Sequence, residues 1–236
     1  MSRVPGALNF RDVGGLPAGE GTTRANVLFR SGNLAGLGDD GRSALAGLGI
    51  RRIVDLRADD EVALEPSRLG DLEIDTVRVP LFLGSIASFF VEDRSLGEMY
   101  RGLVDDSAER LVDAARAVLV GQPVLVHCTV GKDRTGVTVA LLLAAAGVDE
   151  DAIVADYART ERMLPAERNT RVLASLRGLH PHARHLDDLV TRSPAPVMRA
   201  LLRDVRERHG SAAGYLRTHG LDQDEISQLR DLLIDH

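Results

Sequence analysis

The sequence predicts an α/β domain with helical packing at its C-terminal end. Residues 123–128 form a short apolar run that is typical of a buried parallel strand. Residues 135–146 follow after a turn and form an almost wholly apolar helix, which is usually a buried one. Both strand and helix patterns precede this pair, and only helical patterns follow it.

The other elements are read from periodicity and from turn residues. The N-terminal part is rich in glycine and turn signals between Gly14 and Gly21. Strands are expected at 27–29, 50–56 and 74–79, with helices at 38–48 and 107–120. Further helices are expected at 150–162, 165–179, 196–209, 211–219 and 222–234. We expect all 236 residues to form a single domain.

Composition excludes several classes of function. The formal net charge of −6 argues against non-specific nucleic-acid binding. No apolar run approaches the ~20 residues that span a bilayer, and no secretory signal pattern is visible. A single cysteine excludes an intramolecular disulfide. We expect a cytoplasmic protein without stable membrane insertion; export without a signal peptide and the oligomeric state stay open.

Two residue types that each occur once in the chain lie close together. Cys128 is the only cysteine, and Lys132 is the only lysine among 29 basic residues. Chance could place any single residue there, but a chain so biased toward arginine has kept its one lysine four positions after its one cysteine. This spacing favours a functional loop.

The segment from His127 to Gly136 suits the cleavage of phosphate esters. Cys128 lies where a strand ends and Arg134 where a helix begins, and such a position favours the thiolate form of a cysteine. The backbone N–H groups of residues 129–134 can surround phosphoryl oxygens, and the Arg134 guanidinium can bind two of them. The predicted phosphate-binding residues are Thr129, Val130, Gly131, Lys132, Thr135 and Gly136.

Three of these loop residues have a more specific expected role. Gly131 and Gly136 permit tight curvature and close approach of a ligand. The Thr135 hydroxyl can donate to the sulfur and stabilise it as a leaving group. The expected scheme is two-step covalent catalysis with Cys128 as the nucleophile.

The pattern Cys-x5-Arg-Thr resembles the signature of the protein tyrosine phosphatase superfamily. The longer form His-Cys-x-x-Gly-Lys-Asp-Arg-Thr-Gly is similar to the bacterial tyrosine/serine phosphatase family. Further matching blocks are 9–15, 28–32, 53–57, 155–157 and, more weakly, 214–216. The resemblance implies a central, mostly parallel sheet flanked by helices, with Cys128 as nucleophile and Arg134 as phosphate clamp. It implies no cofactor, and a phosphotyrosine-containing protein or another phosphomonoester as substrate.

Lysine within the loop also resembles the phosphoinositide phosphatases. An ammonium at Lys132 could bind a second phosphate, so phosphoinositide hydrolysis is the alternative activity. The resemblance also makes residues 165–190 a candidate helical lid, although amphipathic packing explains the helix at 165–179 equally well.

The acid that protonates the leaving group is the weakest part of the match. Relatives can carry an aspartate after the strand that here ends at Pro80, but residues 80–85 contain no carboxylate. Asp133 is the best candidate, with loop ordering as an equal alternative. Glu92 and Asp93 are further candidates. An aryl leaving group needs less help from an acid, which favours phosphotyrosine over phosphoserine.

Supporting roles are expected for three residues near the loop. His127 can tune Cys128 through hydrogen bonding or can be a buried structural histidine. Asp55 and Arg57 follow a strand at the same sheet edge, where Asp55 can organise the loop. The cluster His180, His182 and His185 fits a polar turn better than a metal site, and no metal is predicted.

Two other functions compete with the enzyme. A non-catalytic phosphotyrosine-binding module would use the same loop, but the intact cysteine and arginine argue against it. A rhodanese-like sulfurtransferase also carries a cysteine loop at a helix, but Arg134-Thr135-Gly136 after five intervening residues favours phosphate.

Overall fold

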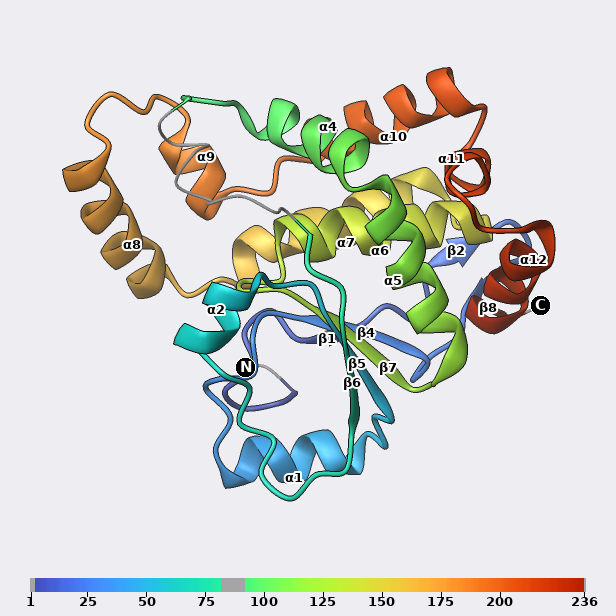
Figure 1. Cartoon of the computed structure of the whole chain (residues 1–236), viewed down its shortest axis with the longest axis horizontal. Coiled ribbons are helices and arrows are strands. Elements are labelled where there is room, and N and C mark those ends of the chain that lie inside the picture. Colours follow the sequence, from blue (N-terminus) through green and yellow to red (C-terminus); the bar gives the residue numbers. More distant parts are fainter. Residues whose placement is uncertain (1–2, 82–91, 236) are drawn as a thin grey trace.

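A five-stranded sheet forms the centre of the protein (Figure 1), in the order β1-β4-β7-β5-β6. The structure is a computed structural model that describes residues 3–81 and 92–235. The strands are β1 (Arg11–Asp12), β4 (Leu28–Ser31), β5 (Arg52–Asp55), β6 (Asp75–Arg78) and β7 (Val124–His127). Within this sheet, among the described residues, β1 pairs antiparallel with β4 and the other pairs are parallel. The mostly parallel sheet expected from the family resemblance is therefore confirmed.

The two faces of the sheet carry different helices, because successive side chains of a strand point to opposite sides. Phe29, Ile53 and Leu125 join the apolar cluster that includes Leu45 of α1 (Asp39–Gly47). Leu28, Val54 and Val126 join the larger cluster on the other face. That cluster includes residues of α4 (Leu96–Asp106), α5 (Ala108–Val120), α6 (Asp133–Ala146), α7 (Glu150–Met163), α10 (Ala195–His209), α11 (Ala212–Thr218) and α12 (Gln223–Leu233).

The helix α6 lies at the centre of the larger face. It contacts β7 as well as α5, α7, α11 and α12, so it has apolar neighbours on nearly every side. Eleven of its 14 residues are buried. This arrangement confirms the buried central helix that the unbroken apolar run predicts.

The carboxyl ends of three parallel strands meet at one edge of the sheet. Ser31 of β4 and Asp55 of β5 both stand opposite His127, the last residue of β7. Ligands of open α/β sheets bind outside this edge. The polar residues that end these strands therefore mark where a site is built.

Sequence analysis missed the shorter elements. A second sheet joins β2 (Pro17–Ala18), β3 (Gly21–Thr23) and β8 (Ile234–Asp235), and β8 is distant in sequence from its partners. The helices α2 (Asp59–Leu64) and α9 (Leu186–Thr191) have six residues each and give little periodicity, and the 11-residue α4 was also missed. Two of these missed helices, α2 and α4, contribute side chains to the site below.

The helix α8 (Ala166–Leu179) lies beside α9 and extends from one side of the molecule (Figure 1). All of its residues are described and none is buried, in contrast to α6. Within residues 3–81 and 92–235, no helix combines the length and apolar character needed to cross a membrane.

Candidate active site

The loop between β7 and α6 carries Cys128 at the carboxyl edge of the sheet. Cys128 is 3% exposed, and its Sγ accepts a hydrogen bond from the Gly131 N–H at 3.3 Å. The first N–H groups of α6 follow within the same loop, and a helix N-terminus attracts negative charge. The surroundings of the sulfur therefore stabilise an anion.

Gly131 is held from behind by two donors. Its carbonyl oxygen accepts from Asn9 Nδ2 at 2.8 Å and from Arg30 Nη2 at 3.0 Å. Its φ of 72° suits glycine, and a Cβ there would lie 2.3 Å from the carbonyl oxygen of Ser31. Fixing the carbonyl on one side fixes the direction of the loop and thereby aims the Gly131 N–H at the sulfur.

A buried ionic cluster supports these donors. Asp156 of α7 accepts from Arg11 Nε at 2.7 Å and from Arg30 Nη1 at 2.9 Å, and all three side chains are almost fully enclosed. Burial opposes ionisation of Asp156, but the two arginines hold its pKa below the usual value. The blocks 9–15, 28–32 and 155–157 are distant in sequence, and this cluster brings them together behind the loop.

Arg134 is fixed by Glu61, a residue that sequence analysis did not identify. Arg134 Nη1 lies 2.5 Å from Glu61 Oε2, and Nη2 lies 2.6 Å from Oε1. The Thr129 hydroxyl also donates to Glu61, and the Ala58 N–H does so at 2.9 Å. Burial opposes ionisation of Glu61, but these contacts hold its pKa at about 2. Glu61 is therefore a carboxylate at neutral pH and sets the plane of the guanidinium.

The one local signal for Glu61 is that it is the third residue of a short acidic helix, α2. Its carboxylate accepts a hydrogen bond from the Ala58 N–H and so caps the first turn of α2. Glutamate is common at this position of a helix. That local role gives no hint of its contact with Arg134, which depends on the tertiary fold.

Asp55 and Arg57 brace the segment that leads to α2. Arg57 donates to Asp55 from Nε at 2.9 Å and from Nη2 at 2.7 Å. Arg57 Nη1 also donates to the Glu65 carbonyl at 2.7 Å, just after α2. Burial opposes ionisation of Asp55, while Arg57 lowers its pKa. The pair thus ties the end of β5 to the C-terminal end of α2, the helix that carries Glu61.

Asp133 lies at the start of α6 and is 24% exposed. Its Oδ1 accepts from the Tyr100 hydroxyl of α4 at 2.8 Å and lies 3.3 Å from Lys132 Nζ. The Tyr100 hydroxyl is also 2.7 Å from that of Tyr157 on α7. Burial, followed by the charge of Asp133, raises the pKa of Tyr100, so this hydroxyl keeps its proton. Asp133 is thus oriented by its neighbour Lys132 and by Tyr100, which sequence analysis did not connect to it.

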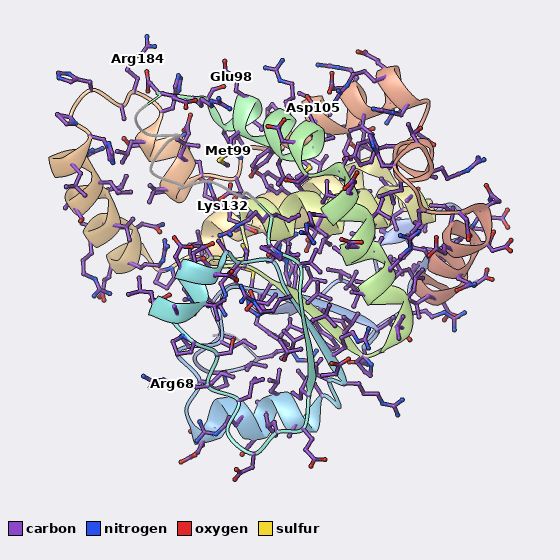
Figure 2. The ribbon with its side chains drawn as sticks, in the orientation of Figure 1. Arg68, Glu98, Met99, Asp105, Lys132 and Arg184 are labelled. Atoms are coloured by element: carbon purple, nitrogen blue, oxygen red, sulfur yellow. The ribbon has the colours of Figure 1, made fainter. Side chains whose placement is uncertain are left out.

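The Lys132 ammonium is committed to protein carbonyls. Its Nζ donates to the carbonyl oxygens of Asp188, Leu189 and Arg192 at 2.8–3.1 Å. Figure 2 shows Lys132 within the molecule, close to α9. An ammonium has only three donors, so a second phosphate has no free donor here. In this structure the ammonium anchors α9, and phosphate binding by this side chain stays a prediction.

Gly136 and Thr135 differ in how they fit the expected roles. The Gly136 N–H donates to the Lys132 carbonyl within α6, and a Cβ would approach the Tyr157 ring at 3.2 Å, so close packing explains this glycine better than phosphate contact. Thr135 is buried, and its hydroxyl has no hydrogen-bond partner among the described residues. No bond to the Cys128 sulfur is formed in this state. Val130 is partly exposed beside Gly131.

His127 lies beneath the loop and is fully buried. Its Nδ1 is 3.2 Å from the Cys128 carbonyl oxygen, and its Nε2 is 3.7 Å from Asp55 Oδ2. Burial lowers its pKa, so the ring is neutral at physiological pH. His127 thus touches the backbone of Cys128 and connects it to the Asp55–Arg57 pair.

The two alternative acids lie elsewhere. Glu92 pairs with Arg94 at 2.6 Å. Asp93 accepts from Arg184 Nε at 2.7 Å, in the segment between α8 and α9. Residues 82–85, where relatives can carry an acid, lie outside the described residues. Within residues 3–81 and 92–235, no group of three or more His, Cys, Asp or Glu side chains is arranged to hold a metal.

Comparison with known proteins shows the family of the chain. Residues 2–235 match the sequence model of a tyrosine phosphatase family. The chain is 33% identical to the triple specificity protein phosphatase PtpB of Mycobacterium tuberculosis over 277 aligned positions, which cover 99% of each chain. It is 34% identical to a tyrosine-protein phosphatase of Nostoc commune, over 87% of this chain and 74% of that relative.

The fold and the cysteine loop define a cysteine-dependent phosphatase, an enzyme that acts on phosphomonoesters. More particularly, this chain belongs to the tyrosine phosphatase family.

Proposed function

We propose that the enzyme hydrolyses phosphotyrosine in cytoplasmic proteins and that Cys128 is its nucleophile. The thiolate attacks phosphorus, an S–P bond forms, and the bond from phosphorus to the tyrosine oxygen breaks. Water then attacks the cysteinyl phosphate, which releases inorganic phosphate and regenerates the thiolate. The observation that carries this proposal is the Gly131 N–H at 3.3 Å from the Cys128 sulfur, at the N-terminus of α6.

Arg134 is the proposed clamp for the transferred phosphoryl group. Its side chain lies at the first turn of α6, where Glu61 and the Thr129 hydroxyl hold the guanidinium in place. A guanidinium that is already oriented binds two oxygens with little further loss of freedom, and these bonds strengthen as charge develops in the transition state. The backbone N–H groups of residues 129–134 would surround the remaining oxygens.

The proposal is tested first with p-nitrophenyl phosphate. We expect Cys128→Ser to abolish turnover, and iodoacetate to inactivate the wild type by modifying one residue, since the chain has only one cysteine. Orthovanadate should protect against that modification. Turnover that persists in Cys128→Ser would exclude the covalent mechanism, binding without turnover in the wild type would indicate a phosphotyrosine-binding module, and cyanide-dependent thiocyanate formation would indicate a sulfurtransferase.

Asp133 is the proposed acid that protonates the leaving oxygen. It lies beside Arg134, remains partly exposed, and is oriented by Tyr100, whereas Glu92 and Asp93 are held by other arginines. Asp133→Asn should lower kcat for an alkyl phosphate about 100-fold, because an alkoxide leaves poorly without a proton. The loss with p-nitrophenyl phosphate should be much smaller, because that phenolate leaves readily.

Asp231→Asn is a matched control for this test, because Asp231 is exposed on α12, on a different helix from Asp133. It should leave both rates unchanged. An equal loss on alkyl and aryl substrates in Asp133→Asn would assign Asp133 to ordering the loop through Lys132 and Tyr100 instead.

A further inference from the structure

A groove begins beside the catalytic loop and runs under α8. It has a volume of about 790 Å³, and Thr129 forms part of its lining. Thr129 follows Cys128 in sequence, and its hydroxyl is 3.2 Å from Arg134 Nη2. The groove is therefore continuous with the site at which a phosphoryl group would bind.

Three arginines line this groove: Arg68, Arg168 and Arg171. Among the described residues of the lining, Glu65 is the only acidic one, and its carboxylate already accepts from Asn33 at 2.5 Å. None of the three guanidinium groups lies within 4.0 Å of a carboxylate in residues 3–81 or 92–235. Figure 2 shows Arg68 on the side of the molecule that carries α8. The groove thus carries an excess of positive charge in a protein whose net charge is negative.

The positive charge of Arg168 is only partly balanced by its surroundings. Burial lowers its pKa, and the negative charges of Glu65 and Asp133 only partly oppose that effect. Arg168 lines the same groove as Thr129, a residue of the catalytic loop. An arginine that remains charged in such surroundings is stabilised when an anion binds beside it.

The groove also has an apolar side. Leu64 of α2 is 83% exposed, and Leu8, Pro66 and Val172 line the same space. The apolar and cationic side chains together suit a peptide better than a bare sugar phosphate, which would leave the apolar surface uncovered. An extended chain advances about 3.3 Å per residue, so neighbours of a bound phosphotyrosine would enter a groove that begins at Thr129.

We infer that this groove binds the polypeptide next to the phosphotyrosine, and that Arg168 and Arg171 select substrates with acidic side chains at that place. The inference rests on the proposed function, because it requires a phosphotyrosine at Cys128. It assigns substrate selection to α8. A helix that contacts the substrate must stay accessible, which explains why α8 has no buried residues.

The experiment compares two phosphotyrosine peptides of equal length. The acidic peptide has Asp and Glu around the phosphotyrosine, and the neutral peptide has Asn and Gln at the same positions. The wild type should show kcat/KM about tenfold higher for the acidic peptide, as expected for two charge-assisted contacts in a partly enclosed groove. The double variant Arg168→Gln/Arg171→Gln should reduce this ratio to about one. The matched control Arg217→Gln/Arg230→Gln removes the same charge from α11 and α12 and should keep the wild-type ratio.

A charge reversal separates recognition from misfolding. Arg168→Glu/Arg171→Glu should prefer a peptide with lysines around the phosphotyrosine over the acidic one, which an unfolded protein cannot do. An unchanged ratio in both double variants, or an equal fall in the control, would overturn the inference. The inference would also be overturned if Arg168→Gln/Arg171→Gln lost activity on a soluble inositol phosphate and kept the wild-type ratio of kcat/KM for the two peptides. Cys128-dependent hydrolysis of p-nitrophenyl phosphate by the wild type tests the proposed function separately.

Discussion

Two groups of arginines flank the loop that carries Cys128, and they differ in partners and burial. Behind the loop, Arg11 and Arg30 are enclosed and bound to Asp156, and Arg30 also holds the Gly131 carbonyl. In the groove, Arg168 and Arg171 are partly or fully exposed and have no carboxylate within reach among the described residues. Arginine supplies 28 of the 29 basic residues, so residue type cannot separate structural from recognition roles. The two roles are separated by whether a carboxylate partner lies within reach of the guanidinium group.

The largest effect is expected behind the loop. Asp156→Asn leaves two buried guanidinium groups without their counter-charge, and breaking such a pair typically costs about 3–5 kcal/mol. Urea unfolding followed by circular dichroism should show this loss in the free energy of unfolding. Activity should also fall, because Arg30 would no longer be held against the Gly131 carbonyl.

The matched control for this variant is Asp151→Asn on the same helix. Asp151 is exposed and pairs with Arg199 at the surface, so its loss should change stability by less than about 0.5–1 kcal/mol. A cost below about 1 kcal/mol for Asp156→Asn would show that the rear arginines do not depend on this carboxylate.

A smaller effect is expected in front of the loop, at Glu61. Glu61→Gln removes the charge that orients Arg134, and a charge-assisted contact of about 1.5–3 kcal/mol corresponds to about 10–100-fold in rate. We expect this loss in kcat, with KM little changed, because the guanidinium is needed most in the transition state. Stronger inhibition by phosphate in the variant would contradict this role, since it would show that Glu61 competes with the substrate for Arg134.

The same contact makes a prediction about acid stability. The pKa of Glu61 is depressed to about 2 in the folded protein, so its stabilising contribution is complete above about pH 4.5 and is lost as the pH falls toward 2. The unfolding free energy of the wild type should therefore decline more steeply over that range than that of Glu61→Gln. Parallel pH profiles for the two proteins would show that the contact with Arg134 is absent in solution.

These sites differ in how far the sequence could predict them. The buried strand before Cys128 and the apolar helix after Arg134 are local patterns, and both appear in the structure where they were expected. Glu61 and Tyr100 lie on helices whose local patterns do not reveal their partners, 73 and 33 residues away. Lys132 stood out by its rarity, but only the tertiary fold shows that its ammonium binds the carbonyls of α9. Local chemistry predicted the loop, and non-local packing determined what supports it.

The smallest effect is expected for stability in the groove. Arg171 has no ionic partner among the described residues and is exposed, so Arg171→Gln should change the free energy of unfolding by less than about 0.5 kcal/mol. Differential scanning calorimetry beside Asp156→Asn would place both groups of arginines on one scale. A loss above about 1 kcal/mol would mean that Arg171 supports the fold. The arginines of the groove would then not differ from those behind the loop in their contribution to stability. A neutral result leaves binding as the reason for a charge that folding does not need.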